Sequence, residues 1–414
     1  MGYFKDTIKG ISWTGALRGF NRGIVFVKLA ILARLLTPEQ FGVFGIATLV
    51  LAFLEIITET GINIFLIQEK ADLKKYIDTA WIVSIARGFL ITIFLFLLSP
   101  AISSFFNSPE SYKLLLLLSL VPLIRGFVNP AIVKFQKDLN FSKEFLFRFS
   151  IYFIDAFAAV LIAVKTHSPL ALVVGMIVAA IFEVVFSHLF IKPAPKLKFE
   201  FGKVKRVINR GKWLTAAGLF NYLFENVDDA VVGRLMNTGS LGLYQMAYKI
   251  SSLPLTEVSG VVQKVTFPVY VKIAADRLRL KRAFIKSLAA TAILVLPLGI
   301  VLLVFPSPIV RIILGERWLA IVPVVRVMSF FGVIRALTIS SYPLFLALKK
   351  QEYVSLVTLV GIAGLGVSIV PLVVKYGIMG AGLSAIIGSI AAVPVVAYYL
   401  VKIFGKNQKI CAIR

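Results

Sequence analysis

Residues 287–305 read SLAATAILVLPLGIVLLVF and residues 355–374 read SLVTLVGIAGLGVSIVPLVV, with no charged side chain in either run. An α-helix rises about 1.5 Å per residue, so about 20 apolar residues cross the hydrocarbon core of a bilayer. Backbone groups inside lipid must find their hydrogen bonds within the segment, which leaves a helix as the form of such a run. Both runs therefore predict membrane-spanning helices.

The same pattern recurs along the whole chain. Of its 414 residues 59% are hydrophobic, and the mean hydropathy is +0.90, whereas soluble domains are roughly 45–50% apolar. We predict an all-α polytopic membrane protein with about twelve transmembrane helices. The predicted spans are residues 13–35, 41–67, 79–99, 111–132, 145–164, 169–191, 213–235, 241–268, 284–305, 319–346, 354–374 and 378–403.

Basic side chains are unevenly distributed between the two sides of these spans. The formal charge of +25 is typical either of nucleic-acid binding or of the positive-inside bias of membrane proteins. Loops on the side of both termini hold 27 lysines and arginines, whereas the opposite loops hold 4. This asymmetry predicts a multi-pass protein of the cell membrane with both termini in the cytoplasm, and it argues against nucleic acid as a partner.

The two halves of the chain resemble each other at an offset of 200 residues. ARLLTPEQFGVFGIA (33–47) aligns with GRLMNTGSLGLYQMA (233–247). The identical pairs are Arg34 and Arg234, Leu35 and Leu235, Gly42 and Gly242, and Ala47 and Ala247. Six helices in each half, both halves starting in the cytoplasm, make a parallel repeat, and transporters of this kind bind substrate between the halves. We predict six-helix lobes over residues 1–200 and 201–414 around a central cleft.

Signatures of soluble enzymes are missing from the sequence. It has no P-loop, no Gly-x-Ser-x-Gly element and no His/Cys cluster with the spacing of metal ligands. The longest predicted loop, at 192–212, is too short for a folded catalytic domain, which argues against a membrane-embedded glycosyltransferase or polymerase. We therefore expect a transporter rather than an enzyme, with no catalytic residues, no metal and no cofactor.

Charged residues inside the predicted spans gather on the first, second, seventh and eighth helices. A charge at mid-bilayer costs roughly 2.5–3.5 kcal/mol, so it normally faces a cavity or a partner. Because the seventh and eighth spans repeat the first and second, we expect these four helices to line the cleft. The charges are Arg18, Arg22, Lys28, Glu55, Glu59, Glu225, Asp228, Asp229, Lys249, Glu257 and Lys264.

Arg18, Arg22 and Lys28 are the candidate substrate-binding residues. Arg18 and Arg22 lie one turn apart and share a face of the first span. Their forked donors suit a phosphate or another anion, which they can bind bidentately. Two other interpretations stay open: ion pairs with acids of the second span that hold the helices together, and snorkelling to lipid headgroups.

Glu55, Glu59 and Asp228 are the candidate ion-coupling residues. A carboxyl group that is desolvated in a spanning helix can take up a proton. Pairing with the arginines of the first span is the structural alternative for Glu59, and a role such as helix capping is the alternative for Asp228.

Gly15, Gly19 and Gly23 form a row at four-residue spacing on the first span. Small residues let a neighbouring backbone approach closely, and they lower the cost of bending. This row predicts a tight helix contact or a bend.

Four stretches carry a resemblance to a known family. They are LARLLTPEQFGVFGIA (32–47), ETGINIFLIQ (59–68), VDDAVVGRLMNTGSLGLYQMAYKISSLPL (227–255) and VTFPVY (265–270). They resemble the polysaccharide biosynthesis flippases of the Wzx/WzxC type, in the multidrug/oligosaccharidyl-lipid/polysaccharide exporter superfamily. The resemblance covers essentially the whole chain, and its motifs mark the family rather than the substrate.

This resemblance implies the translocation of a polyprenyl-diphosphate-linked oligosaccharide from the cytoplasmic to the outer leaflet by alternating access, for surface polysaccharide biosynthesis. It also implies a cationic central cavity, where Arg18, Arg22 and Lys28 would lie. The implied partners are the lipid-linked oligosaccharide, anionic membrane lipids and glycan-assembly proteins.

The sequence departs from the family pattern at two places. Glu59 stands where the family often has the aspartate of an Asp-x-Gly element, and Asn237 stands where it usually has a glycine. A multidrug/cation antiporter of the same superfamily is the alternative function, although basic residues in the cleft would repel organic cations.

Overall fold

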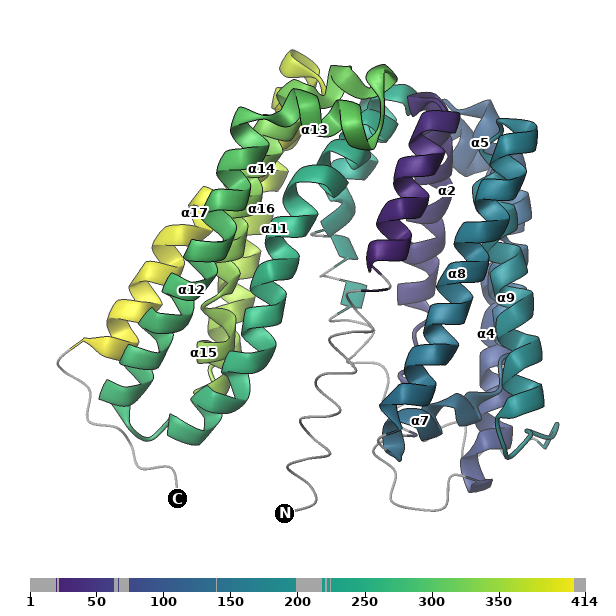
Figure 1. The fold of residues 1–414 in the computed structure, drawn as a ribbon, viewed down its shortest axis with the longest axis horizontal. Coiled ribbons are helices and arrows are strands. Elements are labelled where there is room, and N and C mark those ends of the chain that lie inside the picture. The colour runs from purple at the N-terminus through teal and green to yellow at the C-terminus, as the bar shows by residue number, and fades with distance from the viewer. Residues whose placement is uncertain are drawn as a thin grey trace. The chain divides into compact units, whose positions relative to one another are not determined.

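The computed structural model describes residues 20, 22–62, 66, 74–138, 140–198, 218–219, 222–223 and 225–405. Within these residues all regular structure is helical (Figure 1), which confirms the predicted all-α fold. The chain divides into two compact units, one of Met1–Ala230 with Asn237–Gly242 and one of Val231–Met236 with Leu243–Arg414. The predicted lobes over residues 1–200 and 201–414 stay a prediction.

The first unit is a bundle of helices that contains two apolar clusters, of which the larger forms its main core (Figure 1). After helical residues 22–35 come α2 (Pro38–Ile57), α4 (Lys74–Phe105), α5 (Pro109–Leu118), α6 (Leu120–Gly126), η1 (Pro130–Val133), α7 (Lys134–Lys137), α8 (Phe141–Thr166) and α9 (Leu170–Phe190). The core joins α2, α4, α5 and α9 through the buried side chains of Leu51, Leu95, Leu115 and Val173. In lipid such bundles are held by close packing of side chains rather than by a hydrophobic force.

The second unit contains most of α11 (Thr238–Ile273) and the remaining helices. These are α12 (Arg277–Val304), α13 (Pro306–Ile313), η2 (Glu316–Ile321), α14 (Val322–Ile339), α15 (Tyr342–Ala347), α16 (Gln351–Tyr376) and α17 (Ile378–Phe404). Helices α16 and α17 form a tight hairpin, turned at Gly377 with a φ of +60° that favours glycine. Their backbones approach so closely that a Cβ on Gly364 would lie 3.1 Å from the Cα of Gly388.

Nine of the twelve predicted spans correspond to described helices that are long and apolar enough to cross a membrane, if one bent pair is counted as a single span. Eight of the described helical stretches are long and apolar enough to cross a membrane, and the pair Pro109–Gly126 and Pro130–Lys137, bent by 70°, makes a ninth if it is one span. The other three predicted spans are the first, the seventh and the eighth, which are helical where the structure describes them. The described helical stretches of the first and seventh spans are shorter than the 18 residues needed to judge a span, whereas the eighth, α11, has 36 residues and is about 54 Å long.

The sequence repeat is reproduced in local structure. The helices of the first and seventh spans end at residues 35 and 235, and after a two-residue break a new helix begins at Pro38 and at Thr238. Thr37 forms a capping box with Gln40, whose backbone N–H donates to the threonine hydroxyl oxygen over 3.4 Å. Asn237 repeats this cap, because its Oδ1 accepts from the backbone N–H of Ser240 over 2.7 Å.

The matched glycines Gly42 and Gly242 face each other inside the first unit. A Cβ on Gly42 would lie 1.7 Å from the carbonyl oxygen of Thr238, and a Cβ on Gly242 would lie 2.0 Å from the carbonyl oxygen of Pro38. The contact is reciprocal, since Pro38 and Thr238 are themselves equivalent in the repeat. The first turns of α2 and α11 therefore cross at a distance that only glycine permits, which explains why both halves have glycine at this position.

Candidate functional site

An ion pair joins the first predicted span to α8. Lys28 donates from Nζ to Asp155 Oδ2 over 2.7 Å, and the two side chains are only 13% and 19% exposed. Asp155 lies near the middle of α8, where it faces α9 at Gly175, and its Oδ1 is buried without a hydrogen-bond partner among the described residues. Such a pair compensates two charges that would be costly alone inside a bilayer.

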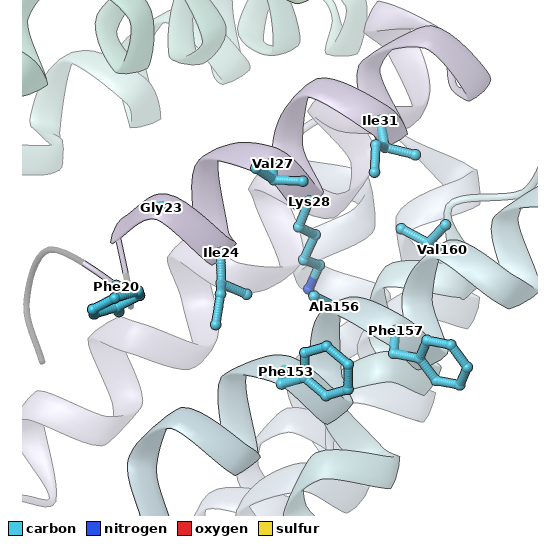
Figure 2. Close-up of a pocket in the computed structure, with 10 residues that line it drawn as sticks. All are labelled: Phe20, Gly23, Ile24, Val27, Lys28, Ile31, Phe153, Ala156, Phe157 and Val160. Atoms are coloured by element: carbon cyan, nitrogen blue, oxygen red, sulfur yellow. The ribbon is translucent and has the colours of Figure 1, made fainter. Parts of the chain in front are cut away.

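A groove of about 650 Å³ lies beside Lys28, between helical residues 22–35 and α8 (Figure 2). The lining residues are Phe20, Gly23, Ile24, Val27, Lys28, Ile31, Phe153, Ala156, Phe157 and Val160. Lys28 is the one charged residue among them, and its ammonium points toward α8 beside Ala156 in Figure 2. The groove is thus an apolar surface whose single lining charge is neutralised by Asp155.

Glu59 is held just beyond the end of α2 by an arginine of α4. Glu59 Oε2 lies 3.5 Å from Arg87 Nη2, and its Oε1 accepts from the backbone N–H of Gly61 over 3.0 Å. Arg87 also donates to the carbonyl oxygen of Glu55 over 2.5 Å and to the hydroxyl of Thr58 over 3.1 Å. Arg87 therefore caps the C-terminus of α2, where a cation also interacts favourably with the helix dipole.

We expect Arg87→Leu to lower the free energy of unfolding by about 1.5–3 kcal/mol, because charged donors to the carbonyl end of α2 are lost. Arg87→Lys should recover part of the lost stability, because a lysine keeps the positive charge near the end of α2 but lacks the several donors of the guanidinium group. Glu59→Gln is the control: Glu59 is 37% exposed, so its loss should cost at most about 1 kcal/mol. Thermal unfolding of the purified variants ranks their stabilities. Equal losses of stability in Arg87→Leu and Glu59→Gln would contradict the capping role of Arg87.

The other predicted acids have different surroundings. The carboxylate of Glu55 is half-buried on α2 and has no ion pair or hydrogen bond within the part of the chain that the structure describes. Asp228 is 8% exposed, and its Oδ1 accepts from the backbone N–H of Asp229 over 3.0 Å. Ion coupling by Glu55, Glu59 and Asp228 remains a prediction, with Glu55 and Glu59 close together at the C-terminal end of α2.

The second and seventh predicted spans meet inside the first unit. Tyr222 donates its hydroxyl to the carbonyl oxygen of Leu49, and its ring packs 5.8 Å from that of Phe53. Gly218 approaches Ile56 further along α2, with 3.4 Å from its Cβ position to Ile56 Cγ2. The described residues 218 and 222 of the seventh span therefore lie along α2.

The predicted anion-binding residues are only partly placed. Arg18 lies outside the described residues, as do Gly15 and Gly19 of the glycine row. Arg22 is exposed on the helical stretch 22–35. Gly23 has open space at its Cβ position, with no heavy atom of the described residues within 4 Å, so it makes no tight backbone contact there. Substrate binding by Arg18, Arg22 and Lys28 stays a prediction.

Asp155 is the residue that the sequence reasoning missed. It stands in the run FIDAFAAV (153–160), an acid in the middle of an otherwise apolar predicted span. The rule that identified Glu55 and Glu59, namely that a charge inside a span needs a partner, applies equally to Asp155. Its position on a helix outside the four expected to line the cleft left it unassigned.

The sequence is similar to proteins of polysaccharide biosynthesis. Residues 31–323 match the family described as "Polysaccharide biosynthesis protein". The chain is 26% identical over 334 residues to the lipopolysaccharide biosynthesis protein WzxC of Escherichia coli (strain K12), covering 80% of this chain and 68% of that protein. It is also 26% identical over 347 residues to the teichuronic acid biosynthesis protein TuaB of Bacillus subtilis (strain 168), covering 80% and 69%. The succinoglycan biosynthesis transport protein ExoT of Rhizobium meliloti (strain 1021) is 23% identical over 326 residues, covering 78% and 66%.

The fold is similar to that of solved transporters. The lipid II flippase MurJ, in an inward closed conformation, aligns with a TM-score of 0.74 and 17% identity over 94% of this chain and 88% of that chain. An inward-facing multidrug resistance transporter of the MATE family aligns with a TM-score of 0.66 and 13% identity over 94% of both chains. At these identities the likeness is one of fold: an all-α membrane protein with many spans.

Proposed function

Because this chain belongs to the polysaccharide biosynthesis protein family, we propose that it flips a polyprenyl-diphosphate-linked oligosaccharide from the cytoplasmic to the outer leaflet by alternating access. The family match over residues 31–323 supports this function most directly. A fold in common with both a lipid II flippase and a multidrug transporter is compatible with it. Transport needs binding and conformational change only, so the proposal includes no catalytic step and no enzyme activity.

In this proposal Arg18, Arg22 and Lys28 bind the diphosphate of the substrate. Two phosphates offer several charged oxygens, and each charge-assisted hydrogen bond to them contributes roughly 1.5–3 kcal/mol where water is scarce. Lys28 can reach a phosphate only by leaving Asp155, because its ammonium lies against that carboxylate. Arg18 and Arg22 would therefore bind the diphosphate first. Lys28 would bind it only after its ion pair with Asp155 is broken, which costs free energy.

Glu55, Glu59 and Asp228 are the proposed ion-coupling groups. Glu55 is the best placed of them, because its half-buried carboxylate has no partner in the described part of the chain and is open to a proton or cation. Anionic membrane lipids and glycan-assembly proteins complete the proposed set of partners.

Both termini and the 192–212 connector are proposed to face the cytoplasm, on the charge count given above. The test begins by removing the single cysteine with Cys411→Ser. Ser240→Cys should then react with an impermeant thiol reagent added to intact cells, whereas Ala194→Cys should react only after lysis. The reverse labelling pattern would overturn this topology.

The proposed function is tested with proteoliposomes that contain a polyprenyl-diphosphate-linked oligosaccharide with a fluorescent sugar. We expect the protein to make the inner-leaflet sugar accessible to an external glycosidase, and the double variant Arg18→Ala, Arg22→Ala to lose this activity while remaining folded. The control is Arg311→Ala with Lys375→Ala, which removes two exposed cations from the second unit and should leave flipping intact.

The structural interpretation of the two arginines predicts a different outcome. In that case the double variant should be destabilised, and adding Glu55→Gln and Glu59→Gln should restore it. Normal flipping by the double variant would leave anion binding unsupported. Transport of an organic cation, with no flipping of the lipid-linked sugar, would favour the antiporter instead.

A further inference from the structure

We propose that the groove between helical residues 22–35 and α8 holds the isoprenoid chain of the lipid-linked substrate while its diphosphate lies beside Arg22. This inference rests on the proposed function and adds a binding site for the hydrocarbon part of the substrate. The groove lies entirely within the first unit, so its shape is set by helices of one compact body.

The groove is open along its length rather than enclosed. Phe20, Val27, Phe153 and Phe157 line it, yet each has more than half of its surface exposed. In Figure 2 the side chains of Ile24 and Lys28 extend toward α8. A long, thin apolar molecule could therefore enter from the side, without passing through the protein interior.

The lining residues of the groove suit a hydrocarbon chain better than a charged group. Lys28 is the only ionisable lining residue, and Asp155 already compensates its charge at 2.7 Å. As long as this pair is intact, the groove offers no free charge to a headgroup, and Lys28 would meet the diphosphate only after leaving Asp155, which is costly in a bilayer. An isoprenoid chain can lie in the groove while the Lys28–Asp155 pair stays intact.

A ladder of phenylalanines extends the groove along α8. Phe145, Phe149, Phe153 and Phe157 recur every four residues, and successive rings stack with centroids 5.7, 6.2 and 6.1 Å apart and planes within 20°. Phe20 closes one end with an edge-on contact to Phe145 at 5.9 Å. From Phe145 to Phe157 the ladder covers about 18 Å of helix, and it presents a continuous apolar strip to a chain lying along it.

The positive charge of Arg22 at one end of the groove suits an amphiphile with an anionic head. Arg22 directly precedes the lining residue Gly23 and is exposed, near the end that Phe20 closes. An apolar groove with a cation at its end complements a molecule that has one long hydrocarbon chain and an anionic head. A polyprenyl diphosphate has this form, and its two phosphates suit a guanidinium better than a single point charge does.

Gly23 supplies a substitution that fills the groove without disturbing the protein. Its Cβ position has no heavy atom of the described residues within 4 Å, so the side chain of Gly23→Leu would occupy the space left for the ligand. Gly366→Leu on α16 is the matched control, because Gly366 is also exposed, helical and without a described neighbour within 4 Å. Both changes raise helix propensity by a similar amount, so folding should be equally preserved.

The experiment uses a polyprenyl diphosphate with a diazirine on its chain, and in a parallel arm a phosphatidylglycerol with a diazirine on its acyl chain. Each is incorporated into proteoliposomes with the full-length protein, and labelled peptides are mapped by mass spectrometry. We expect the polyprenyl probe to label the α8 peptide that contains Phe153 and Phe157, and unlabelled polyprenyl diphosphate to compete. Gly23→Leu should lose this labelling, and Gly366→Leu should keep it.

Two results would overturn the site. One is labelling of α8 by the phosphatidylglycerol probe that polyprenyl diphosphate does not displace, which would assign the groove to bulk lipid. The other is unchanged polyprenyl labelling in Gly23→Leu. Normal flipping of the lipid-linked sugar without labelling of α8 would reject the groove and keep the proposed function, whereas labelling without flipping would keep the groove and reject that function.

Discussion

Asp155→Asn is expected to lower the free energy of unfolding by about 3–5 kcal/mol, because it leaves the ammonium of Lys28 buried without its counter-ion. The pair is 13% and 19% exposed and lies at the middle of α8, so neither water nor lipid headgroups can replace the missing carboxylate easily. Thermal unfolding of the purified protein in detergent, followed by the loss of monodisperse material, measures the effect.

The double variant Lys28→Met, Asp155→Leu tests whether the ion pair stabilises the protein by charge compensation or by the packing of the two side chains. Replacing both members by apolar residues of similar size should recover most of the stability, since no uncompensated charge is left. Glu316→Gln is the control: its partner is Arg311, both side chains are about two-thirds exposed, and its loss should cost less than about 1 kcal/mol. A double variant as unstable as Asp155→Asn would show that packing, not charge compensation, is what the pair provides.

The same double variant also tests the proposed role of Lys28. If Lys28 binds the diphosphate, the stable double variant should still be impaired in flipping. If Lys28 serves only Asp155, flipping should return together with stability. Measuring both properties on one protein thus distinguishes a residue that touches substrate from one that holds two helices together.

Gly42→Ala and Gly242→Ala are each expected to destabilise the first unit by about 1–3 kcal/mol or more, because the new methyl group would overlap a carbonyl oxygen of the facing helix. The new Cβ would lie 1.7 Å from the Thr238 oxygen in the first case and 2.0 Å from the Pro38 oxygen in the second. Relief requires the first turns of α2 and α11 to separate, and the two substitutions should have effects of similar size because the contact is reciprocal.

Gly366→Ala provides the matched control on an open helix surface. With no described neighbour within 4 Å, alanine there should be neutral or stabilise the helix by up to about 1 kcal/mol. Thermal midpoints of the three variants, compared at equal detergent and protein concentration, test the prediction. Midpoints for the Gly42 and Gly242 variants that match the control would mean that the two helices do not cross this closely.

The sequence alone determined the class of fold and most of the spans. Runs such as 287–305 and 355–374 became α12 and α16, because partition into a bilayer depends on the summed hydropathy of about 20 neighbouring residues. The repeat was also visible, since the helix caps at Thr37 and Asn237 meet a local backbone requirement at equivalent positions. The reason for the matched glycines Gly42 and Gly242 appeared only in the structure, where α2 and α11 cross at these residues.

Tertiary structure decided which charges meet and where the groove lies. The structure places Arg87 of α4 beside Glu59, a partner that the sequence did not suggest. It also gave Lys28 a partner 127 residues away in Asp155, and set Phe153 and Val27 on the two helices that line the groove. Helix formation is fixed by neighbours along the chain, but an ion pair depends on how two helices are rotated and crossed, and that follows from the packing of all their side chains together.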